Sequence, residues 1–222
     1  MSSLVRATLS DQVHLELRNR ILSGALKSGH RLLPEELSQD LSISQTPIKE
    51  ALLKLEADGL VVSGLRKGVL VRLFTLKDVE ELYEARILIE LEVIDTLFSR
   101  KAIASAALDK LDENLERYAF HLKRGTREDL AEALALDRAF HHHFVQARDN
   151  AVIADWHAKI LAQTHTAYVY LSGDPSRVRE EHEAILNAIR SGSRSDTKAA
   201  LRQHLMRSRD SLLANVRANA GS

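Results

Sequence analysis

Residues 34–60 read PEELSQDLSISQTPIKEALLKLEADGL and contain two helix signals separated by a short turn. One proline opens residues 34–41 and another lies near the start of residues 46–58, where the fixed φ of proline suits the first turn of a helix. Gly59 then provides a stop, because glycine readily adopts the left-handed conformation that ends many helices. The spacing predicts a helix, a tight turn and a second helix, and the second helix of such a pair can enter the major groove of DNA.

The flanking residues complete the pattern of a winged helix-turn-helix. Residues 11–22 are amphipathic and predict an earlier helix, with one apolar face formed by Val13, Leu17 and Ile21. Residues 61–62 and 69–71 are valine-rich and predict the two strands of a β-hairpin, whose tip holds Gly64, Arg66, Lys67 and Gly68. We therefore expect residues 1–74 to form a DNA-binding domain of three helices plus a β-hairpin.

From Thr75 onward the strand signals disappear. The segment Thr75-Leu76-Lys77-Asp78 resembles a capping box in which aspartate is the acidic partner. We expect helices at about residues 78–99, 105–123, 127–147, 152–171, 175–191 and 195–217. The predicted fold class is mostly α, with a winged helix-turn-helix followed by an all-α bundle of six or seven helices in residues 75–222.

The composition excludes several classes of protein. The chain has no cysteine, so disulfides, thiolate chemistry and cysteine-bound zinc are excluded and a reducing cytoplasm fits best. Residues 1–10 hold no apolar signal core, and the richest apolar run, residues 82–98, is interrupted by charges, so we expect no membrane span. Residues 1–74 carry ten Lys and Arg against eight Asp and Glu, a balance that permits DNA binding without demanding it.

Several side chains lie where a winged helix would contact DNA. The leading edge of the second helix carries side chains that can bond base edges or phosphates, namely Ser44, Gln45, Thr46 and Lys49. Arg31, ahead of the 34–41 helix, is a further phosphate candidate, and Arg66, Lys67 and Gly68 suit a wing that enters a minor groove. Taken singly, each basic residue is an ordinary solvated charge. Only the order of helix, turn, helix and basic hairpin along the chain favours DNA binding.

Four polar residues fall on apolar helix faces in the C-terminal half. Asp137 and His141 are four residues apart, so both project from the apolar face of the 127–147 helix. His182 lies at the centre of the apolar face of the 175–191 helix, and His204 lies at the edge of the apolar stripe of the last helix. Burying these groups costs several kcal/mol unless they are paired or bound to a metal.

The spacing leaves two interpretations of these four residues open. They could surround a divalent cation, with nitrogen and oxygen ligands that suit zinc first, and also nickel or manganese. They could equally form a hydrogen-bonded core cluster without metal. We expect plain surface or helix-packing roles for the histidines His14, His30, His121, His157 and His165.

The N-terminal sequence resembles the GntR-type regulators. The resemblance is carried by residues 21–24, 26–32, 36–38, 42–52 and 55–60, nearly all of residues 10–74. Two positions depart from the family, which usually has arginine in place of Gln45 and commonly in place of Lys49. Arginine pairs bidentately with guanine whereas glutamine prefers adenine, so we expect an operator unlike the family's commoner ones.

The C-terminal half resembles the FadR-like class of these regulators. Residues 136–141, 181–186 and 202–205 match its motif of an aspartate, a histidine four residues later and two histidines on later helices. The resemblance implies a metal bound by Asp137, His141, His182 and His204 at the floor of a cavity that receives a small organic acid or sugar acid. By the same analogy Arg86 pairs with the acid, and its equal alternative is a salt bridge to Glu90.

These expectations combine into a ligand-responsive transcription regulator rather than an enzyme. One winged helix contacts about one half-site, so we expect a homodimer on a pseudo-palindromic operator, with residues 75–222 sensing the ligand and forming the dimer. Repression relieved by a metabolite is the family's commonest mode. The competing interpretations are a metal-dependent hydrolase, for which no HExxH-type motif or glycine-rich phosphate loop is present, and a helical adaptor without ligand.

Overall fold

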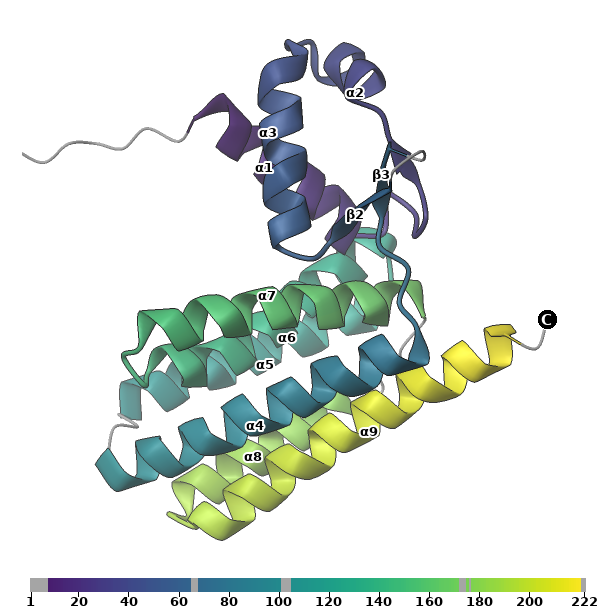
Figure 1. The fold of residues 1–222 in the computed structure, drawn as a ribbon. Helices are drawn as coiled ribbons and strands as arrows, with labels where there is room; N and C mark the ends of the chain where they lie inside the picture. The colour runs from purple at the N-terminus through teal and green to yellow at the C-terminus, as the bar shows by residue number, and fades with distance from the viewer. Residues whose placement is uncertain (1–7, 65–67, 101–104, 172–174, 176, 221–222) are drawn as a thin grey trace, which may run out of the picture. The chain divides into compact units, whose positions relative to one another are not determined.

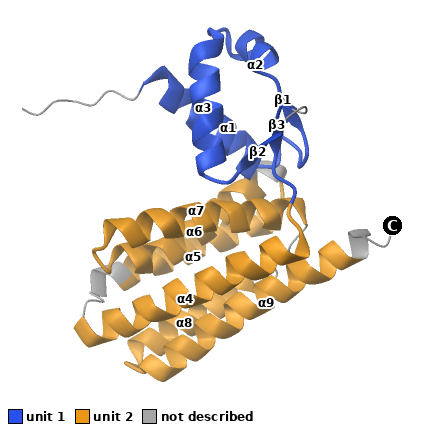
Figure 2. Cartoon of the chain, in the orientation of Figure 1, with its two compact units in different colours: residues 1–73 blue, residues 74–222 orange. Residues whose placement is uncertain are grey.

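The computed structural model describes residues 8–64, 68–100, 105–171, 175 and 177–220, and the chain divides into two units (Figure 2). Unit 1 is residues 1–73 and unit 2 is residues 74–222. The described residues of unit 1 form three helices and three strands: α1 (Leu9–Leu22), β1 (Arg31–Leu32), α2 (Pro34–Leu41), α3 (Gln45–Ala57), β2 (Val61–Gly64) and β3 (Gly68–Val71).

Helix α1 begins two residues before the predicted start because a capping box lies further upstream. Thr8 Oγ1 accepts a hydrogen bond from the backbone N–H of Asp11 at 3.1 Å, and Asp11 Oδ2 accepts one from the N–H of Thr8 at 2.9 Å. These two bonds satisfy backbone donors that the first turn of a helix leaves without intrahelical partners.

The core of unit 1 forms where α1 packs against α3. The predicted face of α1 is buried, with Leu17 and Ile21 both at 0% exposure. On α3 the inward side chains are Ile48, Ala51, Leu52 and Leu55. This packing orients α3 so that its opposite face is exposed to solvent.

The sheet of unit 1 contains one more strand than the predicted hairpin. The strand order is β1-β3-β2, with all pairs antiparallel, and Arg31 of β1 pairs with Leu70 of β3. Gly68 opens β3 with a φ of 71°, in the left-handed region that favours glycine. The hairpin is therefore confirmed, and β1 places Arg31 beside its tip.

Unit 2 is all-α, as predicted. Its helices within the described residues are α4 (Leu76–Arg100), α5 (Ser105–Arg124), α6 (Arg127–Gln146), α7 (Ala151–Tyr170), α8 (Val178–Arg190) and α9 (Arg194–Ala220). The two longest, α4 and α9, run side by side, and α5 packs against α6 (Figure 1). The predicted capping box opens α4, because Asp78 Oδ2 accepts from the N–H of Thr75 at 2.8 Å and Thr75 Oγ1 accepts from the N–H of Asp78 at 3.2 Å.

The core of unit 2 combines apolar side chains from all six helices. Its largest fully buried members include Tyr83 of α4, Tyr118 of α5 and Phe140 of α6. The ring of Phe140 stacks on that of His182 from α8, with centroids 3.8 Å apart and planes 4° from parallel. Polar side chains are thus embedded in this core. Within the described ranges, no helix is long and apolar enough to span a bilayer.

Candidate functional site

The N-terminus of α3 is exposed and polar. Ser44 is the N-cap residue of α3, and its side chain makes no capping hydrogen bond. Ser44, Gln45, Thr46 and Lys49 are all exposed, while Ile48 between them is fully buried. The backbone N–H groups of a helix N-terminus favour anions, so this end of α3 offers both backbone and side-chain partners to a phosphate or a base edge.

Arg31 and Gly68 lie together at the base of the hairpin tip. A Cβ atom added to Gly68 would lie 3.4 Å from Nε of Arg31, so the exposed guanidinium group covers the glycine. Strand β1 thus brings Arg31 to the wing. From the sequence, Arg31 could only be located ahead of α2, without any relation to the hairpin. The other two predicted wing residues, Arg66 and Lys67, lie outside the described residues.

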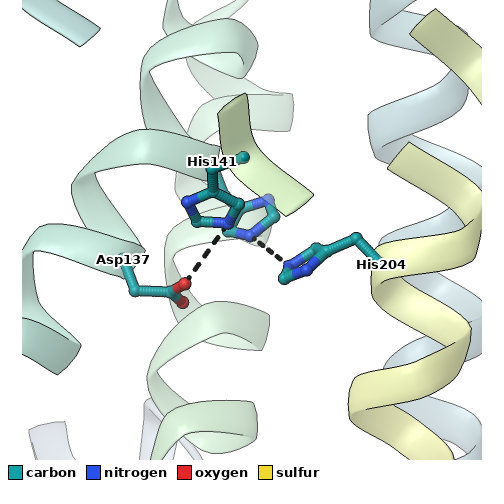
Figure 3. Close-up of side chains that lie close together, drawn as sticks. Asp137, His141 and His204 are labelled. Carbon is teal, nitrogen blue, oxygen red and sulfur yellow. Dashed lines mark hydrogen bonds and ion pairs between the residues drawn. The ribbon is translucent and has the colours of Figure 1, made fainter. Parts of the chain in front are cut away.

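The four predicted metal ligands come together in the core of unit 2. Asp137 and His141 project from one face of α6, His182 comes from α8 and His204 comes from α9, and Figure 3 shows three of these side chains turned toward one another. One ligand atom from each of the four lies within 4.8 Å of all the others. The three histidines are at most 2% exposed, so His204 is buried as deeply as the other two although it lies at the edge of its apolar stripe.

Two of these histidines have their outer nitrogens bound to carboxylates. His141 Nδ1 lies 2.7 Å from Oε2 of Glu90, and His204 Nδ1 lies 2.8 Å from Oε2 of Glu181. A ring that donates its Nδ1–H to a carboxylate keeps a lone pair on Nε2. The Nε2 atoms of His141 and His204 therefore face each other with lone pairs at 3.1 Å, which is repulsive unless a proton or a metal cation lies between them.

The remaining contacts of the cluster favour a cation over a shared proton. Burial lowers the pKa of His141, and burial together with the His204 ring holds the pKa of His182 well below its usual value. Neither ring nitrogen of His182 makes a hydrogen bond within the described ranges, although its Nε2 lies 3.4 Å from Oδ1 of Asp137. A buried, neutral and unpaired imidazole is a good metal ligand.

The donor set and the distances fit a divalent metal. Two ligands about 2.0–2.1 Å from one tetrahedral ion lie about 3.3 Å apart. Two of the six separations are close to this value, at 3.1 Å for His141–His204 and 3.4 Å for His182–Asp137, and all six lie within 4.8 Å. Three imidazoles and one carboxylate suit zinc, nickel or manganese. The residues present therefore fit the metal that the resemblance implies.

Glu90 is a buried carboxylate that contacts three groups at once. Its Oε1 accepts from Nε of Arg86 at 2.8 Å and lies 3.2 Å from Nε2 of His157, while its Oε2 contacts His141. Burial alone would raise the pKa of Glu90, but Arg86 and the two imidazoles outweigh it and hold the pKa well below its usual value. Glu90 stays ionised and links Arg86 to a predicted metal ligand.

Two histidines that we expected on the surface or in plain helix packing belong to this polar centre. His157 is 0% exposed and contacts Glu90, and His165 is 4% exposed, with Nε2 2.9 Å from Oδ2 of Asp137. Burial lowers the pKa of His165 to about 4. The expectation for these two was wrong because much of the circumference of α7 is buried, and a helical wheel then singles out no face.

A small cavity adjoins the cluster. Its volume is about 20 Å³, and it is lined by residues of six helices that include Arg86, Asp137, His165 and His204. Arg86 forms the salt bridge to Glu90 that the sequence left as an alternative, and it also lines this cavity. Nη2 of Arg86 has no hydrogen-bond partner in the part of the chain that the structure describes. The salt bridge to Glu90 and the expected pairing of Arg86 with an acid are therefore compatible.

Known proteins match both units. Residues 9–71 match the family described as bacterial regulatory proteins, gntR family, and residues 81–207 match the FCD domain. These matches and the fold define a class, the transcription regulators in which a helix-turn-helix DNA-binding unit is followed by a helical domain. The chain belongs to the GntR family and carries an FCD domain.

The similarity to related proteins extends over almost the whole chain. The HTH-type transcriptional regulator LutR of Bacillus subtilis is 29% identical over 214 residues, covering 86% of this chain and 95% of the relative. The gluconate operon transcriptional repressor of the same organism is 28% identical over 211 residues, covering 90% and 84%. The solved structure of Escherichia coli McbR/YncC shares the fold, with a TM-score of 0.79, 21% identity and coverage of 94% and 99%.

Proposed function

We propose that this regulator is a repressor that releases its operator when unit 2 binds a small organic acid or sugar acid beside a divalent metal. The two Nε2 atoms facing each other at 3.1 Å, each on a ring already bonded to a carboxylate, are the observation that carries the proposal. A metal at this point would satisfy Asp137, His141, His182 and His204 and supply a Lewis-acidic site for an anion.

DNA binding falls to residues 1–74 in this proposal. The end of α3 would enter the major groove with Ser44, Gln45, Thr46 and Lys49, and the wing would reach the backbone or the minor groove with Arg31, Arg66, Lys67 and Gly68. Gln45 favours adenine at the base it reads. Two copies, joined through residues 75–222, would read the two halves of a pseudo-palindrome in the cytoplasm.

The acid would bind in the cavity, where Arg86 offers an unpaired donor to a carboxylate. The relative named as a gluconate operon repressor supports a sugar acid as one candidate class. Zinc is the first candidate metal, and nickel and manganese are the alternatives. A hydrolase has less support, because the family and the relatives are transcription regulators.

The test begins with selection of preferred duplexes from a random-sequence pool, which should enrich an inverted repeat. Binding to that duplex is then measured with a panel of organic and sugar acids, before and after treatment with a chelator. We expect at least one acid to release the DNA and chelation to abolish this release.

His182→Ala and His121→Ala form a matched pair of variants. His182 belongs to the cluster, whereas His121 on α5 bonds Asp129 at 2.8 Å and lies outside it. We expect His182→Ala to lose bound metal and the acid response while still binding the selected duplex, and His121→Ala to keep all three. Equal metal content in both variants would refute the four-ligand site.

A further inference from the structure

The cavity beside the cluster carries two unsatisfied polar atoms. Nη2 of Arg86 and Nδ1 of His165 have no hydrogen-bond partner among the residues described, and the two residues are only 2% and 4% exposed. Both residues line the cavity. Buried polar groups without partners are costly, so a ligand that pairs with both atoms recovers that cost on binding.

The free atom of Arg86 selects an acceptor. Its Nε is already bonded to Glu90 at 2.8 Å, and the guanidinium group lies over the ring of Tyr83 with Cζ 5.4 Å from the centroid. A guanidinium N–H only donates, and it bonds most strongly to an anionic oxygen. Nη2 is therefore the natural partner of a carboxylate.

The free atom of His165 selects a different group. Nε2 of His165 is engaged by Oδ2 of Asp137 at 2.9 Å, so the ring is held in place and Nδ1 is the only nitrogen left to interact with a ligand. A carboxylate oxygen or a ketone oxygen can only accept a hydrogen bond. A hydroxyl group both donates and accepts, so it pairs with Nδ1 whether or not that atom carries a proton.

We propose that the effector is a hydroxycarboxylate, with its carboxylate on Arg86 and its hydroxyl on His165, which makes His165 a specificity-determining residue. The inference rests on the proposed function, because it assumes that unit 2 binds an organic acid. It narrows that class to acids that carry a hydroxyl group near the carboxylate.

The size of the cavity adds a conformational consequence. A volume of about 20 Å³ accommodates roughly one water molecule, so the acid must spread the side chains around it. The lining comes from α4, α5, α6, α7, α8 and α9. Binding therefore moves at least some of these helices, and the affinity measured is reduced by the free energy of that opening.

The test compares acids that differ only at one oxygen. The probes are the three-carbon set 2-hydroxypropanoate, propanoate and 2-oxopropanoate, the corresponding four-carbon diacids, and gluconate against hexanoate. Binding to zinc-loaded protein is followed by calorimetry and thermal shift, with metal content measured in each sample. We expect the hydroxy member of at least one set to bind about tenfold more tightly than its partners.

His165→Gln and His165→Asn separate the two contacts of the ring. The glutamine amide reaches the position of Nε2 and retains a donor for Asp137, but it places no polar atom at Nδ1. The shorter asparagine amide places a polar atom near Nδ1 and does not reach Asp137. We expect the glutamine variant to keep its zinc and lose the preference for hydroxy acids, and the asparagine variant to keep the preference. His121→Asn is the control, because it changes a histidine that holds a different aspartate, Asp129, and keeps a polar atom near Nδ1, the atom that makes this contact.

The outcomes distinguish this inference from the proposed function. Acids that bind equally with and without the hydroxyl overturn the hydroxycarboxylate inference and leave the acid sensor standing. A preference that persists in the glutamine variant overturns the role of His165. If the glutamine variant loses its zinc, the asparagine variant becomes the test of His165. Loss of the preference for hydroxy acids in the asparagine variant then overturns the role of His165. If no probe binds at millimolar concentration, the acid sensor and the inference both fail.

Discussion

Replacement of Glu90 by glutamine tests how the polar centre of unit 2 is held together. Glutamine matches the shape of glutamate but has no charge, so it accepts hydrogen bonds through only one oxygen and cannot neutralise Arg86. The side chains of Arg86 and Glu90 are each 3% exposed, so solvent does not compensate for the loss. His141 would also lose the carboxylate that orients its ring.

Two effects of Glu90→Gln have separate magnitudes. Removing a carboxylate that bonds a ligating histidine typically weakens metal binding 10- to 100-fold, or about 1.4–2.7 kcal/mol. Leaving Arg86 as an uncompensated buried charge costs about 3–5 kcal/mol in the metal-free protein, with the glutamine oxygen offsetting part of it. We therefore expect weaker metal binding and also a lower free energy of unfolding after chelation.

The assay is a competition titration of zinc against a chromophoric chelator, together with urea unfolding of the chelated protein followed by amide exchange in α4. Glu92→Gln is the matched control, because it makes the same chemical change on an exposed position of the same helix. If both variants bind zinc as tightly as the original protein, Glu90 does not hold His141 for a metal. If the stability of Glu90→Gln also matches that of Glu92→Gln, the buried ion pair has no measurable role.

Further predictions concern pH, DNA contacts and the core of unit 1. As the pH drops below about 6.5, the free energy of unfolding of the chelated protein should decrease by up to about 1.4 kcal/mol per pH unit for each imidazole. The reason is that the unfolded chain then binds protons that the folded state excludes from His141, His165 and His182. Urea unfolding at stepwise pH checks this, and stability that stays level down to pH 5 would contradict it. Lys49→Ala should lower the slope of log affinity against log salt by about 0.9, while Lys123→Ala, exposed on α5, should leave it unchanged. Leu17→Ala should destabilise unit 1 by about 2–5 kcal/mol, because Leu17 is 0% exposed. Leu15→Ala, at a position that is 55% exposed, should change the stability of unit 1 by less than about 0.5 kcal/mol. Amide exchange in α1 measures the stability of both variants.

The helices of this protein could be predicted because their signals are local. Proline at helix starts, glycine at stops and capping pairs such as Thr75 with Asp78 act within a few residues, so they are readable in the chain itself. The strand β1 could not be predicted in this way. It is two residues long and becomes a strand only by pairing with β3, whose partner for Arg31 is Leu70, far along the sequence.

The four candidate ligands were also accessible to sequence reasoning. Asp137 and His141 are polar residues on an apolar face, a conflict that burial makes costly and that points to pairing or to a metal. The carboxylates that hold the rings, Glu90 and Glu181, gave no comparable signal. Each is one acidic residue among many on its helix, and only packing shows that it contacts a histidine from another helix.

The sequence by itself therefore determined the class of protein, the order of its helices and the residues that would be costly to bury alone, because propensity, periodicity and polarity are properties of the chain. The tertiary structure decided which of these residues meet. It placed His157 and His165 in the polar centre, gave Arg86 both a salt bridge and a free donor, and brought the Nε2 atoms of His141 and His204 to 3.1 Å. Such contacts depend on how six helices pack, and packing is set by the shapes of many side chains acting together rather than by any local segment.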